Sequence, residues 1–288
     1  MKTDILADRP TQQGVLAGTS YSVCGEGPPL VLIHGVGMNQ AVWAPQVEAL
    51  RRDLRVVTYD MLGHGGSSLP GVDPTLEDYA EQLAALLDGL QIDAAHVVGH
   101  SMGALVALEF ALRYPARTLS VVTLNAVYDR TPGQREAVMR RAAALQGASR
   151  DGMSTDAARD DPSIDATMAR WFDDPVPAHL VPVADLVRSL LRSVNPLGYA
   201  RTYQLFASSD ASHVGRLPQL SMPALFMTGE CDPNSSPAMS HAMAAAAPCA
   251  RAEIIASERH MMNVTAPERV NRSLMQFIRQ AGNAARQP

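Results

Sequence analysis

The chain has 288 residues, of which 47% are hydrophobic and 18% charged, so it is long enough to bury one extensive core. The net charge of −5 and the lack of any run of five basic residues argue against a nucleic-acid partner. Its three cysteines are Cys24, Cys231 and Cys249, an odd number without paired short spacing, so neither a disulfide framework nor a zinc site is predicted.

The first ten residues lack the apolar core of a signal peptide, and no run of 18 apolar residues occurs. We therefore expect a cytoplasmic protein that does not bind membranes and needs no metal or organic cofactor. A monomer and a homodimer are both compatible with the sequence.

The first predicted buried strand is Leu30–Ile33, and it runs directly into the turn His34-Gly35-Val36-Gly37. An H-G-x-G turn at a strand end is typical of a loop that supplies one backbone N–H group to an oxyanion hole. We assign that donor to Val36. Arg55–Tyr59 is the next strand, and Asp60 ends it in a loop expected to brace the oxyanion region.

Strands alternate with helical patterns from residue 29 to residue 124, as expected of parallel βαβ units. One helix opens near Pro74 and Thr75, with acidic residues in its first turn. It continues as an apolar stripe of core residues, which consists of Leu83, Leu86, Leu87 and Leu90.

The sequence Gly99-His100-Ser101-Met102-Gly103 stands between the apolar strand Ala95–Val98 and the helix-forming stretch Ala104–Tyr114. G-x-S-x-G in a strand-turn-helix context is a nucleophile elbow, which exposes the serine Oγ above the sheet. The pattern predicts Ser101 as nucleophile and the Met102 N–H as the second oxyanion donor. A lone G-x-S-x-G also occurs by chance, so the elbow needs its partners.

After Asn125 the alternation stops, and no strand-like run appears for about eighty residues. Helical segments broken by prolines replace it, at Gln134–Gln146, Asp156–Asp160, Asp165–Phe172 and Val183–Ser193. We interpret residues 127–209 as a helical cap inserted into a core domain formed by residues 1–126 and 210–288. Such a cap supplies most of the substrate pocket.

Two further strands, Ala224–Thr228 and Ala252–Ala256, are followed by loops that hold Asp232 and His260. Serine, then acid, then histidine is the order of partners that follows a nucleophile elbow. The sequence therefore predicts the triad Ser101, Asp232 and His260, in which His260 takes the serine proton and Asp232 orients the imidazole.

Other acids and histidines are weaker candidates for these roles. Asp60 precedes the nucleophile, and Asp129, shortly after the strand Leu119–Leu124, is the one credible substitute for the triad acid. Asp232 could also be only a turn residue before Pro233. His100 is expected to face away from the serine, where it would pack or line the pocket. The last helix is predicted at Pro267–Arg279, before a frayed tail from residue 281 to residue 288.

Four places carry a resemblance to a known family. They are His34-Gly35-Val36-Gly37 with Trp43 after it, Arg170-Trp171-Phe172, Asn195-Pro196-Leu197-Gly198-Tyr199 leading to Asp210, and His260-Met261-Met262-Asn263-Val264. With the elbow, these motifs resemble the α/β-hydrolase superfamily and, within it, the 3-oxoadipate enol-lactonase-like group. The resemblance implies an α/β fold with a mostly parallel sheet flanked by helices, and hydrolysis of a small enol-lactone that bears a carboxylate. Two departures, Ala104 in place of glycine and no acid at Thr265, alter the pocket lining.

Arg170 and Trp171 are predicted to contact a small carboxylated substrate. The planar guanidinium of arginine suits a carboxylate, and the tryptophan ring offers a flat apolar wall. The alternative is a surface arginine beside a tryptophan that only packs the cap. Gly35, His100 and Met261 complete the predicted substrate contacts.

The expected function is a serine hydrolase that acts on a small carboxylated ester or enol-lactone through an acyl-enzyme on Ser101. The same machinery serves a carbon–carbon bond hydrolase of dienoic acids and a carbon–nitrogen hydrolase of a small catabolic acid. A small-molecule receptor built on this fold is the non-enzymatic alternative, which slow turnover and ligand-dependent partner binding would favour.

Overall fold

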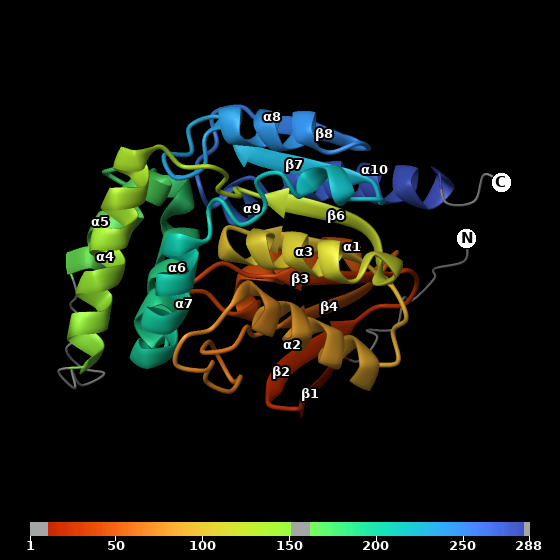
Figure 1. The fold of residues 1–288 in the computed structure, drawn as a ribbon, viewed down its shortest axis with the longest axis horizontal. Helices are drawn as coiled ribbons and strands as arrows, with labels where there is room; N and C mark the ends of the chain where they lie inside the picture. Colours follow the sequence, from red (N-terminus) through yellow and green to blue (C-terminus); the bar gives the residue numbers. More distant parts are fainter. Residues whose placement is uncertain (1–10, 151–161, 285–288) are drawn as a thin grey trace.

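A computed structural model describes residues 11–150 and 162–284 of the chain. Its centre is an eight-stranded sheet in the order β1-β2-β4-β3-β5-β6-β7-β8 (Figure 1). The strands are β1 Gln12–Leu16, β2 Thr19–Cys24, β3 Pro29–Ile33, β4 Arg55–Tyr59, β5 Ala95–His100, β6 Thr118–Leu124, β7 Ala224–Gly229 and β8 Ala250–Ile255. The strands from β3 onward pair in parallel, so the predicted α/β fold with a mostly parallel sheet is confirmed.

The sheet begins with a hairpin that the sequence did not predict. β1 and β2 pair antiparallel with each other, and β2 pairs antiparallel with β4. β1 reads Gln-Gln-Gly-Val-Leu and lies half-exposed at the sheet edge. Such a strand lacks the continuous apolar run by which strands buried on both faces are identified.

Helices cover both faces of the sheet because the parallel strands bury side chains on both sides. Val31 and Ile33 of β3 belong to one core, and Leu30 and Leu32 to the other. The first core is covered by α2 Leu76–Gly89, α3 Met102–Arg113 and α8 Pro237–Ala246. The second is covered by α1 Ala44–Leu50, α9 Met262–Thr265 and α10 Pro267–Ala284.

The last helix is longer than predicted. α10 runs to Ala284, five residues beyond the predicted end at Arg279, so residues 281–284 belong to the helix and not to a tail. Phe277, Ile278 and Ala281 are buried at helical spacing, and this packing extends the helix. Residues 285–288 lie outside the described residues.

Four helices lie between β6 and β7, at the carboxyl edge of the parallel strands on the left of Figure 1. They are α4 Pro132–Arg150, α5 Pro162–Phe172, α6 Val181–Ser193 and α7 Pro196–Ser208. Three of the segments predicted as helical fall within α4, α5 and α6, and α7 was not predicted. The segment Asp156–Asp160 lies outside the described residues. The boundaries of a separate cap at residues 127 and 209 stay a prediction.

Short 3₁₀ helices complete the described chain, at η1 Gln40–Trp43, η2 Pro115–Arg117, η3 Ala178–Leu180 and η4 Leu217–Gln219. In the part of the chain that the structure describes, no helix has the length and apolarity needed to span a bilayer.

A buried carboxylate fixes α3, the helix that begins directly after Ser101. Glu109 of α3 is 7% exposed and accepts hydrogen bonds from Arg216 at 2.7 and 3.1 Å and from His213 Nε2 at 3.2 Å. Burial alone would raise the pKa of Glu109, but these hydrogen bonds and the charge of Arg216 lower it from 4.5 to about 2. The carboxylate form therefore stabilises the fold above pH 4.5, and the stabilisation is lost as the pH falls toward 2.

Replacing Glu109 by glutamine is expected to lower the free energy of unfolding by about 2–3 kcal/mol at pH 7. The difference from wild type should shrink below pH 4.5, as urea denaturation at a series of pH values would show. Glu77→Gln is the matched control, since Glu77 pairs with Arg113 where the two side chains are 46% and 34% exposed. It should cost less than about 1 kcal/mol. Equal losses in the two variants would contradict the role given to burial.

Candidate active site

Ser101 lies at the turn between β5 and α3, and its backbone has φ 55° and ψ −114°. This left-handed conformation is strained for a residue other than glycine, and such strain is typical of functional sites. A Cβ on Gly99 would lie 2.0 Å from the Gly103 carbonyl oxygen, and one on Gly103 would lie 2.4 Å from the carbonyl oxygens of Ile33 and His34. The two glycines of the motif are therefore required by close backbone contact.

The predicted acid and base are in direct contact. His260 Nδ1 lies 2.9 Å from Asp232 Oδ2, and both side chains are 3% exposed or less. The carboxylate also accepts hydrogen bonds from Ser235 Oγ at 2.5 Å, Asn125 Nδ2 at 2.7 Å and the Asn234 N–H at 2.8 Å. Four donors hold Asp232 in one orientation, with Oδ2 turned to the imidazole.

The environment keeps Asp232 ionised. Burial alone would raise the pKa of Asp232, but His260 and the hydrogen bonds from Ser235 and Asn234 lower it to about 2. An ionised acceptor requires the proton of His260 to sit on Nδ1, which leaves Nε2 as the proton acceptor of the imidazole.

The two competing acids lie in other networks. Asp60 accepts hydrogen bonds from the backbone N–H groups of Gln40 at 2.8 Å and Gly66 at 2.9 Å, so it links its own loop to the segment that follows β3. The Asp129 N–H donates to the Asp210 carbonyl at 2.9 Å. Neither is a hydrogen-bond partner of His260 in the described structure, whereas Asp232 is.

The two predicted oxyanion donors lie on the two loops beside Ser101. Met102 is the first residue of α3, where a helical N–H group has no partner within the helix. Val36 lines the same cavity as Ser101 and His260. The assignment of both N–H groups to an oxyanion hole stays a prediction.

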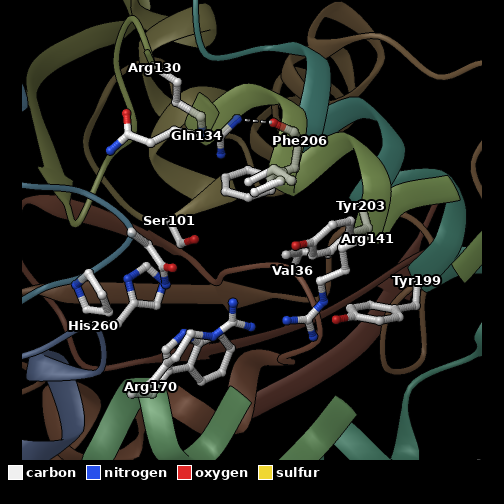
Figure 2. A pocket seen from close by; sticks show the side chains of 15 residues that line it. Val36, Ser101, Arg130, Gln134, Arg141, Arg170, Tyr199, Tyr203, Phe206 and His260 are labelled. Atoms are coloured by element: carbon white, nitrogen blue, oxygen red, sulfur yellow. Dashed lines mark hydrogen bonds between the residues drawn. The ribbon is translucent and has the colours of Figure 1, made fainter. Parts of the chain in front are cut away.

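A cavity of about 200 Å³ opens above Ser101 (Figure 2). The segment between β6 and β7 supplies most of its wall. The lining residues are Val36, Ser101, Arg130, Gln134, Ala137, Val138, Arg141, Arg170, Trp171, Tyr199, Tyr203, Phe206, Pro233, Asn234 and His260.

Three arginines but no carboxylates stand among these described lining residues. Arg130 has a carboxylate partner, because its guanidinium lies 3.5 Å from the buried Asp210 carboxylate, and it stacks 4.6 Å from the ring centre of Phe206. Asp210 also pairs with Arg135 at 2.9 Å. The other two arginines of the cavity have no carboxylate partner among the described residues.

Arg141 and Arg170 extend from α4 and α5, and Figure 2 shows their guanidinium groups turned toward each other across the cavity. Arg141 donates to Thr167 Oγ1 at 2.7 Å, and its buried Nε has no partner in the described structure. Arg170 has neither a hydrogen bond nor an ion pair to a described residue. Burial and the nearby charge of Arg141 lower the pKa of Arg170, so an anion between the two would be favoured.

Trp171 is half-buried and lies against the predicted base, His260. Its ring centre is 5.2 Å from that of His260, with an angle of 31° between the ring planes. Trp171 and Arg170 both line the cavity, where their predicted substrate contacts stay predictions.

The other three predicted contacts lie behind the cavity wall. His100 is 1% exposed and its Nε2 donates to the His260 carbonyl at 2.8 Å, so it supports the loop that holds His260. Met261 is fully buried in the second core. Gly35 is buried, and a Cβ there would lie 3.1 Å from His100 Nδ1. None of the three is among the described lining residues of the cavity, and their assignment as substrate contacts stays a prediction.

Sequence reasoning missed Arg141 and Asn125. Arg141 belongs to a set of cavity residues on α4 spaced at i, i+3, i+4 and i+7, which are Gln134, Ala137, Val138 and Arg141. That spacing was a usable signal for one helix face.

In the described residues, no cluster of histidine, cysteine and acidic side chains suited to a metal ion was found.

A family model described as alpha/beta hydrolase fold matches residues 28–267. The chain is 36% identical to (E)-2-((N-methylformamido)methylene)succinate hydrolase of Acinetobacter baylyi, over 90% of this chain and 93% of that protein. It is 29% identical to 3-oxoadipate enol-lactonase 1 of the same organism, over 93% and 95% of the two chains. The crystal structure of the enol-lactonase from Burkholderia xenovorans LB400 aligns with a TM-score of 0.80 at 26% identity, over 93% of this chain and 99% of that one.

Proposed function

This chain belongs to the alpha/beta hydrolase fold family, and from that premise we propose that it hydrolyses a small acid with two carboxylates through an acyl-enzyme on Ser101. The observation that carries this proposal is the cavity itself. It places Ser101 and His260 beside two arginines, Arg141 and Arg170, with no carboxylate among its described lining residues.

The site supplies each group that acyl transfer needs. Ser101 Oγ attacks the substrate carbonyl carbon while His260 Nε2 takes its proton, and the Val36 and Met102 N–H groups stabilise the developing oxyanion. The protonated imidazole then gives its proton to the leaving nitrogen or oxygen, and the acyl group stays on Ser101. A water molecule, deprotonated by His260, attacks the acyl-enzyme and releases the acid.

The favoured scissile bond is carbon–nitrogen. The relative that is 36% identical is named as the hydrolase of a succinate that carries an N-methylformamido group, and a succinate has two carboxylates. Two carboxylates match the two cavity arginines without an acidic partner there. Arginine and a carboxylate form bidentate hydrogen bonds, which orient the substrate as well as bind it.

An enol-lactone is the second candidate, supported by the 29% identical enol-lactonase and by the similar enol-lactonase structure. In a lactone the leaving oxygen stays attached to the acyl chain, so nothing departs until the acyl-enzyme is hydrolysed. Both candidate reactions would use the same triad, and both substrates carry at least one carboxylate. The reactions differ in the bond that is cleaved.

The test is turnover of (E)-2-((N-methylformamido)methylene)succinate, of a muconolactone-type enol-lactone, and of the methyl esters of both. We expect the amide-type acid to turn over fastest, and the esters to lose affinity because they lack the charges that the arginines bind. Fast turnover of the lactone with none of the amide-type acid would give the second candidate. Equal turnover of acids and methyl esters would contradict the anionic substrate.

Replacing Arg170 by alanine is expected to raise KM for the carboxylated substrate about 10- to 100-fold, since a hydrogen bond to a charged group contributes about 1.5–3 kcal/mol. KM for the methyl ester should change less than about twofold, because no charge pair is lost. Steady-state kinetics with the acid and its ester measure both effects.

Arg140→Ala is the matched control for this variant. Arg140 precedes Arg141 on α4, pairs with Glu136 where both side chains are at least 67% exposed, and does not line the cavity. It should leave both KM values unchanged. If Arg170→Ala affects acid and ester equally, Arg170 packs the wall and does not bind a carboxylate.

A further inference from the structure

Two buried histidines outside the triad join the loop after β3 to the loop after β4. His34 follows β3 and His64 lies four residues beyond Asp60 at the end of β4. Both are 1% exposed or less, and their ring centres are 5.3 Å apart in an edge-on arrangement. The proposed mechanism uses neither imidazole, although the first belongs to the H-G-x-G turn.

Each imidazole accepts a hydrogen bond from the backbone of the other loop. The Met61 N–H donates to His34 Nε2 at 2.9 Å, and the Gly37 N–H donates to His64 Nε2 at 3.0 Å. The remaining nitrogens bond their own loops, His34 Nδ1 to the Gly35 carbonyl at 2.8 Å and His64 Nδ1 to the Leu62 carbonyl at 3.1 Å. We call this reciprocal pair of His34 and His64 the histidine clasp.

These partners define the protonation state of both rings. A carbonyl oxygen can only accept, so Nδ1 carries the proton; a backbone N–H can only donate, so Nε2 must be unprotonated. Burial lowers the pKa of His34 to about 4, and burial and the neighbouring His34 lower that of His64 to about 3. The other titratable groups that act on the pair are Asp60 and His100.

The bond from His34 to Gly35 acts on the oxyanion loop. The Gly35 carbonyl and the Val36 N–H belong to one peptide unit, and no cis bond is found there, so the two groups point in opposite directions. The Gly35 carbonyl accepts from His34 Nδ1 and from the Met38 N–H at 3.2 Å. Because the two groups are opposed, holding the carbonyl on the side of His34 holds the Val36 N–H on the opposite side of the peptide.

We infer that the histidine clasp is the device that aims the Val36 N–H at the reacting carbonyl, with His34 as a positioning residue for the oxyanion hole. This inference rests on the proposed function, because it assumes that Ser101 attacks a carbonyl above the same loop. His34 touches no substrate and acts only through the Gly35–Val36 peptide.

Asparagine and glutamine separate the two bonds of His34. Asparagine places its amide where Nδ1 lies and can still donate to the Gly35 carbonyl. Glutamine places its amide near Nε2 and can still accept from the Met61 N–H, but it loses the Gly35 bond. A role that is only structural would make the loss of activity follow the loss of stability, whichever bond is kept.

The experiment measures the labelling of Ser101 by an alkyl fluorophosphonate, whose phosphoryl oxygen enters an oxyanion hole and which needs no carboxylate site. For His34→Gln we expect the limiting rate of labelling to fall about 100-fold or more, the cost of losing one oxyanion donor, with little change in the concentration for half-maximal rate. For His34→Asn we expect a rate within about tenfold of wild type, even if its melting temperature is lower.

His96→Asn is the matched control, because His96 is a buried histidine of β5 whose Nδ1 lies 2.7 Å from Ser120 Oγ, away from both loops. It should lower the melting temperature and leave the labelling rate unchanged. If a His34 variant does not fold, the glutamine and asparagine variants of His64 are compared in its place. His64→Gln keeps an acceptor for the Gly37 N–H, so it should label faster than His64→Asn.

A labelling rate for His34→Gln equal to that of wild type, or equal rates for the glutamine and asparagine variants, would overturn the inference. Ser101→Ala separates this failure from failure of the proposed function. If the wild-type protein is not labelled, or if the label is found on another residue, the serine mechanism fails. If Ser101 is labelled normally in wild type and in His34→Gln, only the clasp fails.

Discussion

Replacing Ser101 by alanine is expected to lower kcat by about 10⁴- to 10⁶-fold, with KM and stability nearly unchanged. In the proposed mechanism Ser101 supplies the oxygen that bonds to the acyl group, and it lines the cavity from the strained turn between β5 and α3. The residual rate should match that of water attack assisted by the oxyanion donors. Turnover of the amide-type acid, followed by mass spectrometry of the intact chain, measures both the rate and the missing acyl-enzyme.

Ser240→Ala is the matched control for this loss. Ser240 is a fully buried serine of α8 whose Oγ has no hydrogen-bond partner in the described structure. Removing that hydroxyl deletes the same atom without touching the site, so kcat should be unchanged. A kcat of Ser101→Ala within about tenfold of wild type would rule out the acyl-enzyme, because nucleophile removal costs far more than that.

The loops that hold Ser101, Asp232 and His260 could be located from the sequence because each follows a predicted strand. The strands before His34, Ser101 and Asp232 are apolar runs that stop at a turn, and the mixed strand β8 ends before His260. Parallel strands bring such ends to one edge of the sheet. The glycines of the elbow add an independent signal, since close backbone contact leaves no room for a side chain there. Order along the chain then separated Asp232 from Asp60.

The substrate side of the site could be predicted only in part. Arg170 was found beside Trp171, but its partner Arg141 was not, although the face Gln134, Ala137, Val138 and Arg141 has helical spacing. Spacing shows that four residues share a face, not where the face points. That direction is set by the packing of α4 against α7, which is a tertiary contact between segments about 50 residues apart.

The supports of the site were the least predictable. Asn125, with φ 54° at the end of β6, donates to Asp232 across 107 positions of the sequence. The role of His64 could not be predicted either, because its hydrogen-bond partner Gly37 lies on another loop. His100 and Met261 were assigned to the pocket by their neighbours in sequence. Both side chains are buried, and neither is among the described lining residues of the cavity.

Replacing Asp232 by asparagine is expected to lower kcat about 10⁴-fold, the cost of losing the carboxylate that holds the base in its working tautomer. His260 Nδ1, Asn125 Nδ2 and Ser235 Oγ all donate to Oδ2, so the neutral amide cannot satisfy the site as the carboxylate does. Stability should fall as well, because the pKa of Asp232 is held at about 2 and the ionised form stabilises the fold above its ordinary pKa of 3.8. Kinetics and urea denaturation at pH 7 measure the two losses.

Exchanging the pair, with Asn125→Asp added to Asp232→Asn, should separate stability from catalysis. One carboxylate and one amide again share a hydrogen bond at the ends of β6 and β7, so the free energy of unfolding should return toward the wild-type value. The charge then stands on the wrong partner, since position 232 supplies the atom that contacts His260 Nδ1, and kcat should stay at least about 100-fold below wild type. Recovery of kcat together with stability would mean that any carboxylate in this pair can orient His260. A kcat of the single variant Asp232→Asn within about tenfold of wild type would instead remove Asp232 from the mechanism.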